Sequence, residues 1–540
     1  MWTVHPQSKQ LMSQFRCSLL TLIMKLNDAL ARTVRCYPDK LALVTDDGRS
    51  FTYAELDERS TRLANALSER VGAARVAVLT INDASSIESM WAGNKRGSAT
   101  VQLSYRATVT ELADMATTAD AELLVFDDHN VEDAVELVDR GTFERAIHAG
   151  EKSVDHEAIE SYEAVLDDAS PELDASLPHG EECAVLHTSG TTSVPKTVQF
   201  DQEQLWYGAV QVIMEHGIDE TDVALCTSPW YHMVTTDAWL YPHFVAGATV
   251  VLHSTFEPEE ALDLIETHGV TGLLAVPTQL KTLNDIQRGD GRTYDTDTIG
   301  YIRTGGAIVT ENLIEETHEH ISEHVYNTYG MTEAGPDLTF AHPSVQEEHP
   351  GTIGKESFTW EIRVVDSVPL DEHPDPEATV DAGERGEIIA RGPGMSHEYI
   401  DNDEASERSY FDGWLRTRDV ARIDEDGYLY IVDRVDNMIV SGGENVYPAE
   451  VERVLGNHPD VIEACVFGRD DEQWGQVVTA VVVVEEGQEL TDDELDEYCL
   501  QHDGLADFKR PRAYAITEDE LPRTDTGTIM REQLIDKHFD

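Results

Sequence analysis

The stretch Ala184-Val-Leu-His-Thr-Ser-Gly-Thr-Thr-Ser-Val-Pro-Lys-Thr197 is the most informative part of this chain. Its apolar start predicts a short buried strand, and the small hydroxyl-bearing residues that follow predict a loop. Backbone N–H groups and hydroxyls of such a loop can surround an oxyanion, while Lys196 supplies positive charge. By composition, the stretch is a phosphate-binding loop that follows a strand.

The spacing of this loop nearly satisfies the pattern G-x-x-x-x-G-K-[ST] of ordinary nucleoside triphosphatases, but Pro195 stands at the second glycine. Proline lacks the N–H group and the backbone freedom that this position uses. The sequence therefore disfavours an ordinary P-loop enzyme. A polar surface loop that binds no ligand is the alternative interpretation.

Around this loop, short apolar runs alternate with helical patterns, which is typical of a parallel sheet with helices on both faces. We expect strands at residues 184–186, 223–225, 249–252, 272–276 and 324–326, and helices at residues 202–216, 258–268 and 311–320. The region from Lys40 to Phe126 repeats the alternation, with strands expected at 77–79 and 123–126. The predicted fold class is α/β, with doubly wound layers in a large N-terminal domain.

The texture of the sequence changes after Gly351. Shorter extended runs, such as 387–390 and 428–431, flank an acidic loop and predict a small β-rich subdomain over about 351–433. Beyond Arg434, an apolar strand at 477–484 lies between helical segments at 448–455 and 492–500, which predicts an α+β domain over 434–540. The N-terminal domain is thus expected to span 28–433, with a domain boundary at Asp433 to Asp436.

The charge of the chain is its most unusual bulk property. Asp and Glu number 104 against 39 Lys and Arg, so the net charge is −65 over 540 residues. Such a chain repels itself unless concentrated counter-ions screen it, which indicates a halophilic cytoplasm. The same field opposes binding to nucleic acid or to anionic membranes. Six scattered cysteines suggest neither a zinc ribbon nor a disulfide framework, and no apolar run reaches the length of a membrane span.

The first residues differ from the rest, because Met1 to Asn27 contain no acidic residue. We expect residues 1–27 to be a disordered extension or sequence translated from an upstream start, with Met24 as the natural beginning.

Four further motifs accompany the loop in chain order. They are Tyr329-Gly-Met-Thr-Glu333, Thr417-Arg-Asp419, Asp433-Arg-Val-Asp436 and Ser441-Gly-Gly-Glu-Asn-Val-Tyr-Pro-Ala-Glu450. Together with the loop, they resemble the acyl-adenylate-forming superfamily, and most closely its acyl-CoA synthetase branch. The resemblance covers roughly residues 30 to 535. It implies a mobile C-terminal domain that turns about a hinge at Asp436.

The resemblance assigns a role to each motif. Tyr329 would stack on adenine, Glu333 would bind the Mg²⁺ that accompanies ATP, and Thr332 would hydrogen-bond the α-phosphate. Asp419 and Arg434 would hydrogen-bond the ribose. Taken singly, Tyr329 is equally a core aromatic residue, Asp419 a turn residue and Arg434 a member of a surface ion pair.

The remaining expected contacts are with phosphate, adenine, the acid and coenzyme A. Lys196 and its loop would hold the phosphates, and a glycine-rich turn would lie against adenine. His232, in Pro229-Trp-Tyr-His-Met233, resembles the histidine at the mouth of the acyl pocket, and Trp230 and Tyr231 either line that pocket or belong to the core. The expected binding residues are Thr188, Ser189, Gly190, Thr191 and Thr192 in the loop, Gly305, Gly306 and Ala307 at adenine, and Gly443 beside the pantetheine arm of coenzyme A.

Two positions depart from the family pattern. Ser193 stands where the phosphate loop usually has glycine, a change that a negative φ would tolerate. In Pro522-Arg-Thr-Asp-Thr-Gly-Thr-Ile-Met-Arg531, which resembles the C-terminal catalytic loop, Thr528 stands where the family carries its adenylating lysine.

The implied activity has two steps, with ATP, Mg²⁺ and coenzyme A as reactants or cofactors. A fatty or aryl carboxylate would form acyl-AMP with release of pyrophosphate, and the thiol of coenzyme A would then take the acyl group. Three alternatives stay open: an adenylating enzyme with another acceptor, an adenylate-binding protein without full catalysis, and a zinc peptidase based on His320-Ile-Ser-Glu-His324. That zinc chemistry needs both histidines on one helix, whereas we expect the helix to end near His320. The identity of the acid and the oligomeric state are left open.

Overall fold

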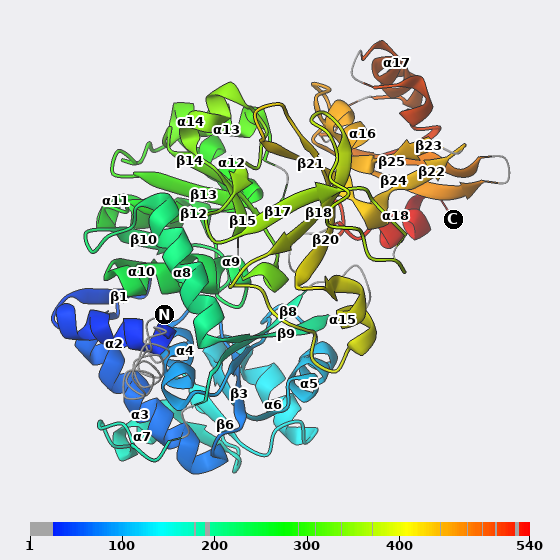
Figure 1. Cartoon of the computed structure of the whole chain (residues 1–540). Helices are drawn as coiled ribbons and strands as arrows, with labels where there is room; N and C mark the ends of the chain where they lie inside the picture. Colours follow the sequence, from blue (N-terminus) through cyan, green and yellow to red (C-terminus); the bar gives the residue numbers. More distant parts are fainter. Residues whose placement is uncertain are drawn as a thin grey trace, which may run out of the picture.

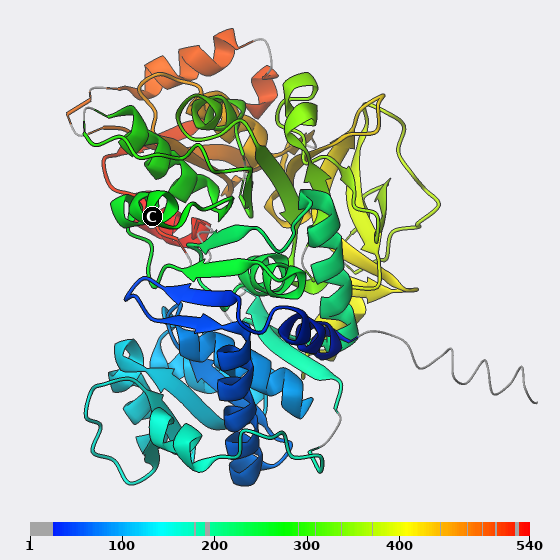
Figure 2. The same ribbon diagram turned by 90° about the vertical axis from the view of Figure 1, so that its left-hand side faces the viewer.

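The computed structural model describes residues 25–540 except 178–179, 189–194, 290, 308, 336, 370, 443, 472–473, 486, 489, 503–504, 524–528 and 540. The strands of these residues form four sheets. In Figure 1 the first half of the chain, blue to green, forms the large lower body, and the orange and red C-terminal elements lie together at one upper corner. Figure 1 also shows the yellow strands between the green elements and the orange ones, and in the side view of Figure 2 these strands lie along the right-hand side.

A nine-stranded sheet forms the centre of the large body, in the order β16-β15-β14-β13-β12-β10-β11-β1-β2. The six strands from β14 to β1 run parallel, and the strands at the two edges are antiparallel. The strands are β1 (Leu41–Thr45), β2 (Ser50–Thr52), β10 (Val223–Cys226), β11 (Thr249–Leu252), β12 (Gly272–Leu274), β13 (Tyr301–Gly305), β14 (Val325–Gly330), β15 (Asp337–Ala341) and β16 (Lys355–Glu356).

A seven-stranded sheet lies beside it, in the order β7-β6-β5-β3-β4-β8-β9, and only its last pair is antiparallel. Its strands are β3 (Arg75–Leu79), β4 (Thr100–Gln102), β5 (Ala121–Asp127), β6 (Ala146–Ala149), β7 (Ile159–Ser161), β8 (Glu182–Thr188) and β9 (Lys196–Asp201).

Both faces of these sheets are buried. Along β11, Val250 packs into one hydrophobic cluster and Val251 into another, and the same alternation separates Val76 from Ala77 on β3. One of these clusters contains residues of both sheets and of the helices between them. Parallel strands that are covered on both faces read as continuous apolar runs, which is why the sequence pattern locates them.

Helices cover the sheets, and polar capping residues and glycines mark where these helices begin and end. Asp201 accepts hydrogen bonds from the N–H groups of Glu203 and Gln204 and begins α8, which ends where Gly217 adopts a left-handed φ of 71°. The helices of the large body are α2 (Leu26–Cys36), α3 (Tyr53–Val71), α4 (Ala84–Arg96), α5 (Val109–Thr118), α6 (Val131–Asp139), α7 (Tyr162–Asp168), α8 (Gln202–His216), α9 (Met233–Thr235), α10 (Tyr241–Ala246), α11 (Pro258–His268), α12 (Pro277–Arg288), α13 (Glu311–His320), α14 (Pro343–Glu348) and α15 (Asp403–Ser409).

The third sheet is a smaller antiparallel one, made of β17 (Glu361–Val365), β18 (Arg385–Arg391), β19 (Tyr410–Phe411), β20 (Trp414–Ile423) and β21 (Leu429–Arg434). A buried ion pair between Arg416 and Glu387 crosses it, and the Arg416 guanidinium also donates to the carbonyls of Val368 and Glu372. These bonds hold the acidic loop that contains Val368 and Glu372 against the sheet.

The fourth sheet belongs to the C-terminal part, with β22 (Ile439–Ser441), β23 (Glu444–Val446), β24 (Glu463–Asp471), β25 (Gly475–Val483) and β26 (Ala513–Thr517). Around it lie α16 (Pro448–Gly456), α17 (Asp492–Gln501) and α18 (Arg531–His538). This mixed α/β architecture, with a large N-terminal and a smaller C-terminal part, confirms the predicted fold class.

Polar contacts join the third sheet to the C-terminal part. The Asp433 carboxylate accepts a hydrogen bond of 2.7 Å from the N–H group of Ala449 at the start of α16. Glu450 pairs with Arg385 of β18 on one oxygen and with Lys509, at 2.6 Å, on the other. The junction is therefore held by a carboxylate on each side.

Most expected elements are found where the sequence places them, and α8, α11 and α13 have the predicted bounds. The expected start of the fold at residue 28 is wrong, because α2 begins at Leu26 and that side chain is fully buried. Lys25 also pairs with Glu181, so the folded part includes residues that we assigned to the extension. None of the helices in the described ranges combines the length and the apolar character that a membrane span requires.

Leu26→Ala should lower the free energy of unfolding by about 2 to 4 kcal/mol, because it leaves a cavity in the main core. Arg32→Ala, an exposed change on the same helix, is the matched control and should alter it by less than about 0.5 kcal/mol. Deleting residues 1–24 should leave the melting temperature unchanged. Thermal denaturation of the three variants checks this, and a marked loss on deletion would show that residues 1–24 add to stability.

Candidate functional site

The sequence motifs come together where parallel strands of both sheets end. The carboxyl end of β8 leads into the phosphate-loop motif, and that of β10 leads into the motif with His232. In the nine-stranded sheet β13 ends at Gly305 beside β14, with Gly305 paired to Thr328. Ligands of open α/β sheets bind outside the carboxyl ends of strands, so these loops delimit the candidate site.

Lys196, Tyr399 and Glu333 form the centre of this site. Lys196 begins β9 opposite Thr188, and its Nζ lies 4.8 Å from the centroid of the Tyr399 ring. The Tyr399 hydroxyl donates to Oε1 of Glu333 at 2.5 Å. Tyr399 is held there because it forms an isolated antiparallel bridge with Val198 of β9, and the N–H group of Ile400 donates to the carbonyl of Thr197.

Burial sets the electrostatics of this centre. It lowers the pKa of Lys196 from its ordinary value, although the negative charge of Glu333 opposes the change. Burial, followed by the charge of Glu333, raises the pKa of Tyr399, so its phenol keeps the proton that it donates. Glu333 itself is buried in the short turn Thr332–Ala334, and Thr332 is partly exposed at the start of that turn.

A second group lies where the end of β21 pairs with the middle of β20. Asp419 faces Arg434 across the strands, with Arg434 Nε 3.4 Å from Oδ1 of Asp419. The Tyr329 hydroxyl donates to the other oxygen of Asp419 at 2.6 Å. Burial raises the pKa of Asp419, while the Arg434 charge acts in the opposite direction. Tyr329 thus orients the carboxylate expected at the ribose.

Arg418, next to Asp419, links this group to the domain junction. Its φ is 65°, a left-handed backbone conformation that residues other than glycine rarely adopt. Its guanidinium pairs with Asp436, the predicted hinge residue. A strained backbone conformation persists only where surrounding contacts hold it, and such conformations cluster at functional sites.

The glycine-rich turn after β13 is open on one side. A Cβ at Gly305 would lie 2.3 Å from the carbonyl oxygen of Thr328, so only glycine allows the two strands to approach there. Gly306 has a φ of 77°, and Gly306 and Ala307 are exposed. A flat aromatic base can therefore lie against this backbone.

His232 lies at the start of α9, partly buried beside aromatic rings. Its ring centroid is 4.4 Å from that of Tyr231, which in turn contacts Tyr105 edge to face at 5.3 Å. Burial, and then the charge of Arg106, lowers the pKa of His232 to about 4, so the imidazole is neutral near neutral pH. Trp230 is fully buried, and its indole N–H group donates to the carbonyl of Thr80, which fixes the ring in the core.

Several expected site residues lie outside the described residues. They are Ser189, Gly190, Thr191 and Thr192 of the phosphate loop, Gly443, and Thr528, together with the departure at Ser193. Thr188 is described and is partly buried at the end of β8.

The zinc-peptidase alternative fails on geometry, because α13 ends at His320 and His324 is exposed before β14. One other cluster among the described residues has metal-type ligands: Asp46, His253 and Glu260. His253 uses both nitrogens already, since Nδ1 lies 3.3 Å from Asp46 and Nε2 accepts from the N–H group of Glu257. This cluster therefore offers no free imidazole lone pair.

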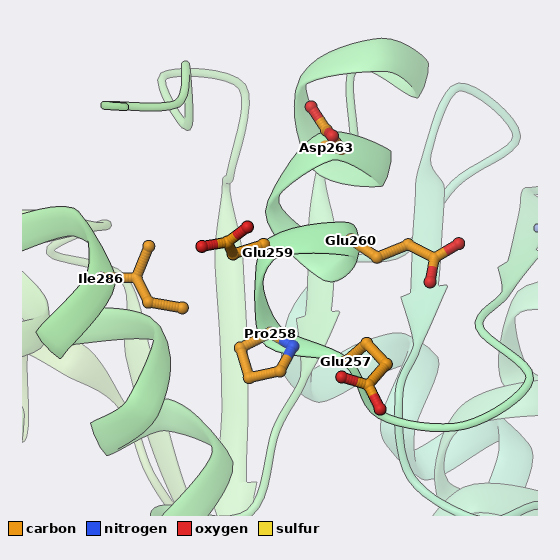
Figure 3. A pocket seen from close by; sticks show the side chains of 6 residues that line it. All are labelled: Glu257, Pro258, Glu259, Glu260, Asp263 and Ile286. Atoms are coloured by element: carbon orange, nitrogen blue, oxygen red, sulfur yellow. The ribbon is translucent and has the colours of Figure 1, made fainter. Parts of the chain in front are cut away.

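Glu260 also borders a surface hollow of about 680 Å³ at the start of α11. Figure 3 shows its lining by Glu257, Pro258, Glu259, Glu260, Asp263 and Ile286, with carboxylates that point in different directions. Divergent exposed carboxylates do not form a ligand cage, and none of the motifs contributes to this hollow.

Sequence analysis missed Tyr399 and Arg418. Tyr399 is 66 residues from Glu333 and belongs to none of the motifs, so only its contact in space reveals it. Arg418 lies inside the quoted motif Thr417-Arg-Asp419, but its left-handed backbone leaves no mark in the sequence.

The arrangement suits a magnesium nucleotide. Glu333 offers a hard carboxylate oxygen, and the Tyr399 hydrogen bond fixes the orientation of that carboxylate. Mg²⁺ commonly takes one or two carboxylates together with substrate phosphates, so a single protein carboxylate beside a lysine fits it. Asp419 and Arg434 present an acceptor and a donor suited to ribose hydroxyls.

Comparisons with known proteins agree with this geometry. The sequence model of the family described as AMP-binding enzyme matches residues 30–400, and that of the AMP-binding enzyme C-terminal domain matches residues 450–528. The chain is 33% identical to a feruloyl-CoA synthase of Amycolatopsis, over 93% of this chain and 97% of the relative. It is 32% identical to the indoleacetate–CoA ligase of Aromatoleum aromaticum, over 95% and 98%.

Among solved structures, the o-succinylbenzoate CoA synthetase of Bacillus subtilis superposes with a TM-score of 0.80 at 29% identity. The match covers 94% of this chain and 97% of that one, which was solved with its acyl-adenylate intermediate. The same enzyme has also been solved with ATP and a magnesium ion.

Proposed function

Since the chain belongs to the AMP-binding enzyme family, we propose that it is a coenzyme A ligase for an aromatic carboxylic acid, suited to a salt-rich cytoplasm. The chain is an AMP-forming acid–thiol ligase: it activates a carboxylic acid to acyl-AMP with ATP and Mg²⁺ and transfers the acyl group to coenzyme A. The observation that carries the proposal is the Lys196–Tyr399–Glu333 contact, which joins three distant segments at one point.

In the first half-reaction, a carboxylate oxygen of the acid attacks the α-phosphorus of ATP and pyrophosphate leaves. Lys196 and the phosphate loop hold the phosphates, and Thr332 donates to the α-phosphate. Glu333 would hold Mg²⁺, which would supply charge neutralisation at the phosphates. Phosphoryl transfer depends mainly on positioning and charge stabilisation, and Tyr399 supports both because its hydroxyl orients Glu333 while its ring contacts Lys196.

The adenosine part is held by the second group. Asp419 accepts from a ribose hydroxyl and Arg434 donates to one, while the Tyr329 ring and the turn at Gly305, Gly306 and Ala307 bracket the adenine. Because Tyr329 already donates to Asp419, the carboxylate is oriented before the nucleotide arrives. Such preorganisation reduces the cost of ordering the site upon binding.

In the second half-reaction, the thiol sulfur of coenzyme A attacks the acyl carbon and AMP leaves with the bonding electrons of the acyl–phosphate bond. We propose that the C-terminal domain, which follows Asp436, rotates between the two steps. Gly443 would then lie beside the pantetheine arm. The contacts of Asp436 with Arg418 and of Glu450 with Arg385 then belong to one orientation of the C-terminal domain. Their exchange would accompany each turnover.

An aromatic acid is favoured over a fatty acid. The relatives with 33% and 32% identity are named for feruloyl and indoleacetate groups. The rings of Tyr231, Tyr105 and His129 lie in contact beside His232, and edge-to-face rings of this kind offer an apolar wall to a planar acid. His232 itself is neutral, so it adds no charge there.

The salt-rich cytoplasm is proposed from the net charge of −65. Folding and activity should need molar KCl, because the Debye length then falls to about 3 Å and like charges no longer repel strongly. Melting temperatures from dilute buffer to molar KCl measure this. A flat profile contradicts the halophilic assignment without affecting the enzymatic one.

The activity itself is tested by release of AMP in molar KCl with coenzyme A and a panel of aromatic and fatty acids. We expect turnover with aromatic acids, and Lys196→Ala and Glu333→Gln should each slow acyl-AMP formation by on the order of a hundredfold. Lys355→Ala is the matched control, because Lys355 is exposed and lies 4.2 Å over the Tyr428 ring, away from the motifs. Acyl-AMP formation at the wild-type rate in both site variants would contradict the roles assigned to Lys196 and Glu333.

Thr528 favours a second candidate, an adenylate-binding protein with impaired adenylation. A neutral hydroxyl stands where the family has a lysine, and a positioned charge in the transition state is worth ~3 kcal/mol. Thr528→Lys should therefore speed acyl-AMP formation at least about tenfold, without a similar gain in thioester formation from supplied acyl-AMP. Single-turnover measurements of each step decide this. An unchanged first step would show that another group already supplies the charge, and the second candidate would lose its support.

A further inference from the structure

Behind the candidate site lies a buried polar cluster of Asp237, Arg303 and Asp337, which the mechanism above does not use. Asp237 and Arg303 are fully buried, and Asp337 is 3% exposed. Arg303 pairs with Oδ1 of Asp337 and donates to the carbonyl of Ala238 at 2.5 Å. Three charged residues in the core of a parallel-sheet domain need an explanation, because buried charges are costly unless they are paired.

The cluster is only partly satisfied. Among the described residues, neither carboxylate oxygen of Asp237 has a hydrogen-bond partner, and Oδ2 of Asp337 and Nε of Arg303 also lack one. Burial, and then the neighbouring charge of Asp337, raises the pKa of Asp237 well above its ordinary value. The cluster thus leaves three carboxyl oxygens and one N–H group without a hydrogen-bond partner among the described residues.

Each member comes from a segment that also supplies a residue of the site. Asp237 lies five residues after His232, in the π-helical turn Thr236–Leu240 that follows α9. Arg303 precedes Gly305 on β13, and Asp337 follows the turn that carries Glu333. The cluster is therefore built from the same three segments that supply the acyl and nucleotide contacts of the site.

The Asp237 carboxyl group occupies space that is available only because residue 208 is glycine. A Cβ at Gly208 of α8 would lie 2.3 Å from Oδ2 of Asp237 and 2.9 Å from the carbonyl oxygen of Gly335. Both oxygens flank the same point, so Asp237 reaches the backbone directly after the Glu333 turn. π-helical turns widen a helix locally and occur frequently at functional sites.

We propose that Asp237, with Asp337 and Arg303, forms the polar inner end of the acyl pocket and accepts a hydrogen bond from a hydroxyl group on the aromatic acid. This inference rests on the proposed function and names the substrate class of the same site. A phenolic hydroxyl donates one hydrogen bond and accepts another, so it can satisfy a free carboxyl oxygen together with the free Nε of Arg303.

A purely structural role is the competing explanation. A carboxyl group that stabilised the core would be fully bonded, as Glu88 is: that residue is also fully buried, but it pairs with Arg59 and accepts from the Tyr162 hydroxyl. Asp237 differs from Glu88 in having no such bonds. Leaving it unsatisfied costs stability, and a ligand that supplies the missing donor offsets that cost.

The test compares acids that differ only by a hydroxyl group: benzoate with para-hydroxybenzoate, and cinnamate with para-hydroxycinnamate. We expect the wild-type enzyme to favour the hydroxylated acid at least about tenfold in kcat/KM, because the unsubstituted acid leaves the buried groups unsatisfied. Asp237→Ala should abolish this preference, with the larger loss of kcat/KM on the hydroxylated acid. Asp237→Asn keeps the shape and one acceptor, and should retain part of the preference.

Glu88→Gln is the matched control for the loss of a buried carboxylate and should leave the hydroxyl preference intact. Melting temperatures show whether each variant is folded, and Asp237→Asn should melt no lower than the wild type. Equal losses on both acids of a pair, or a wild-type enzyme without a hydroxyl preference, would overturn the inference while leaving the ligase activity in place. Absence of AMP release with every acid would overturn the proposed function and this inference together.

Discussion

The burial of both faces of the two parallel sheets leaves their strands little room for charge, and the other features of the molecule follow from this constraint. Alternate residues of β1, β3, β10 and β11 enter different hydrophobic clusters, so polar chemistry is confined to the loops at the strand ends. Lys196, His232, Gly305 and Glu333 all lie at such ends. Arg303 is the exception, a fully buried cation in the middle of β13, and its partners converge behind the site.

Much of the fold could be predicted because local signals coincide with the tertiary structure. Asp201 and Gly217 bound α8, and Gly269 ends α11 in a left-handed conformation, so these helix ends are visible in the sequence. The start of the fold was placed two residues late, because the predicted extension was inferred from missing acidic residues, whereas the burial of Leu26 is a tertiary contact. Charge composition describes the surface and gives no information about what packs inside.

The candidate site was predictable only in part, for a different reason. Motif residues such as Glu333 and Asp419 lie in stretches whose residue order carries the chemistry. Tyr399, which fixes Glu333, and Asp237, which lies free beside Asp337, are recognisable only from contacts across many residues. Neither a hydrogen bond between distant segments nor a polar group without a partner produces a spacing pattern in the sequence. The residues that support the site could therefore be identified only from the structure.

The pairing of β1 with β11 also has a consequence for how the chain assembles. Leu43 lies opposite Val250, about two hundred residues later, whereas the strands of the seven-stranded sheet lie between Arg75 and Asp201 without interruption. During synthesis the smaller sheet can therefore close while β1 and β2 still lack a neighbour. Until α10 and β11 emerge, the apolar edge Leu41–Thr45 and the part of α2 that contacts α8 and α10 remain uncovered. The segment Leu26–Thr45 is thus among the last parts of the large domain to reach its native environment, although it is synthesised first.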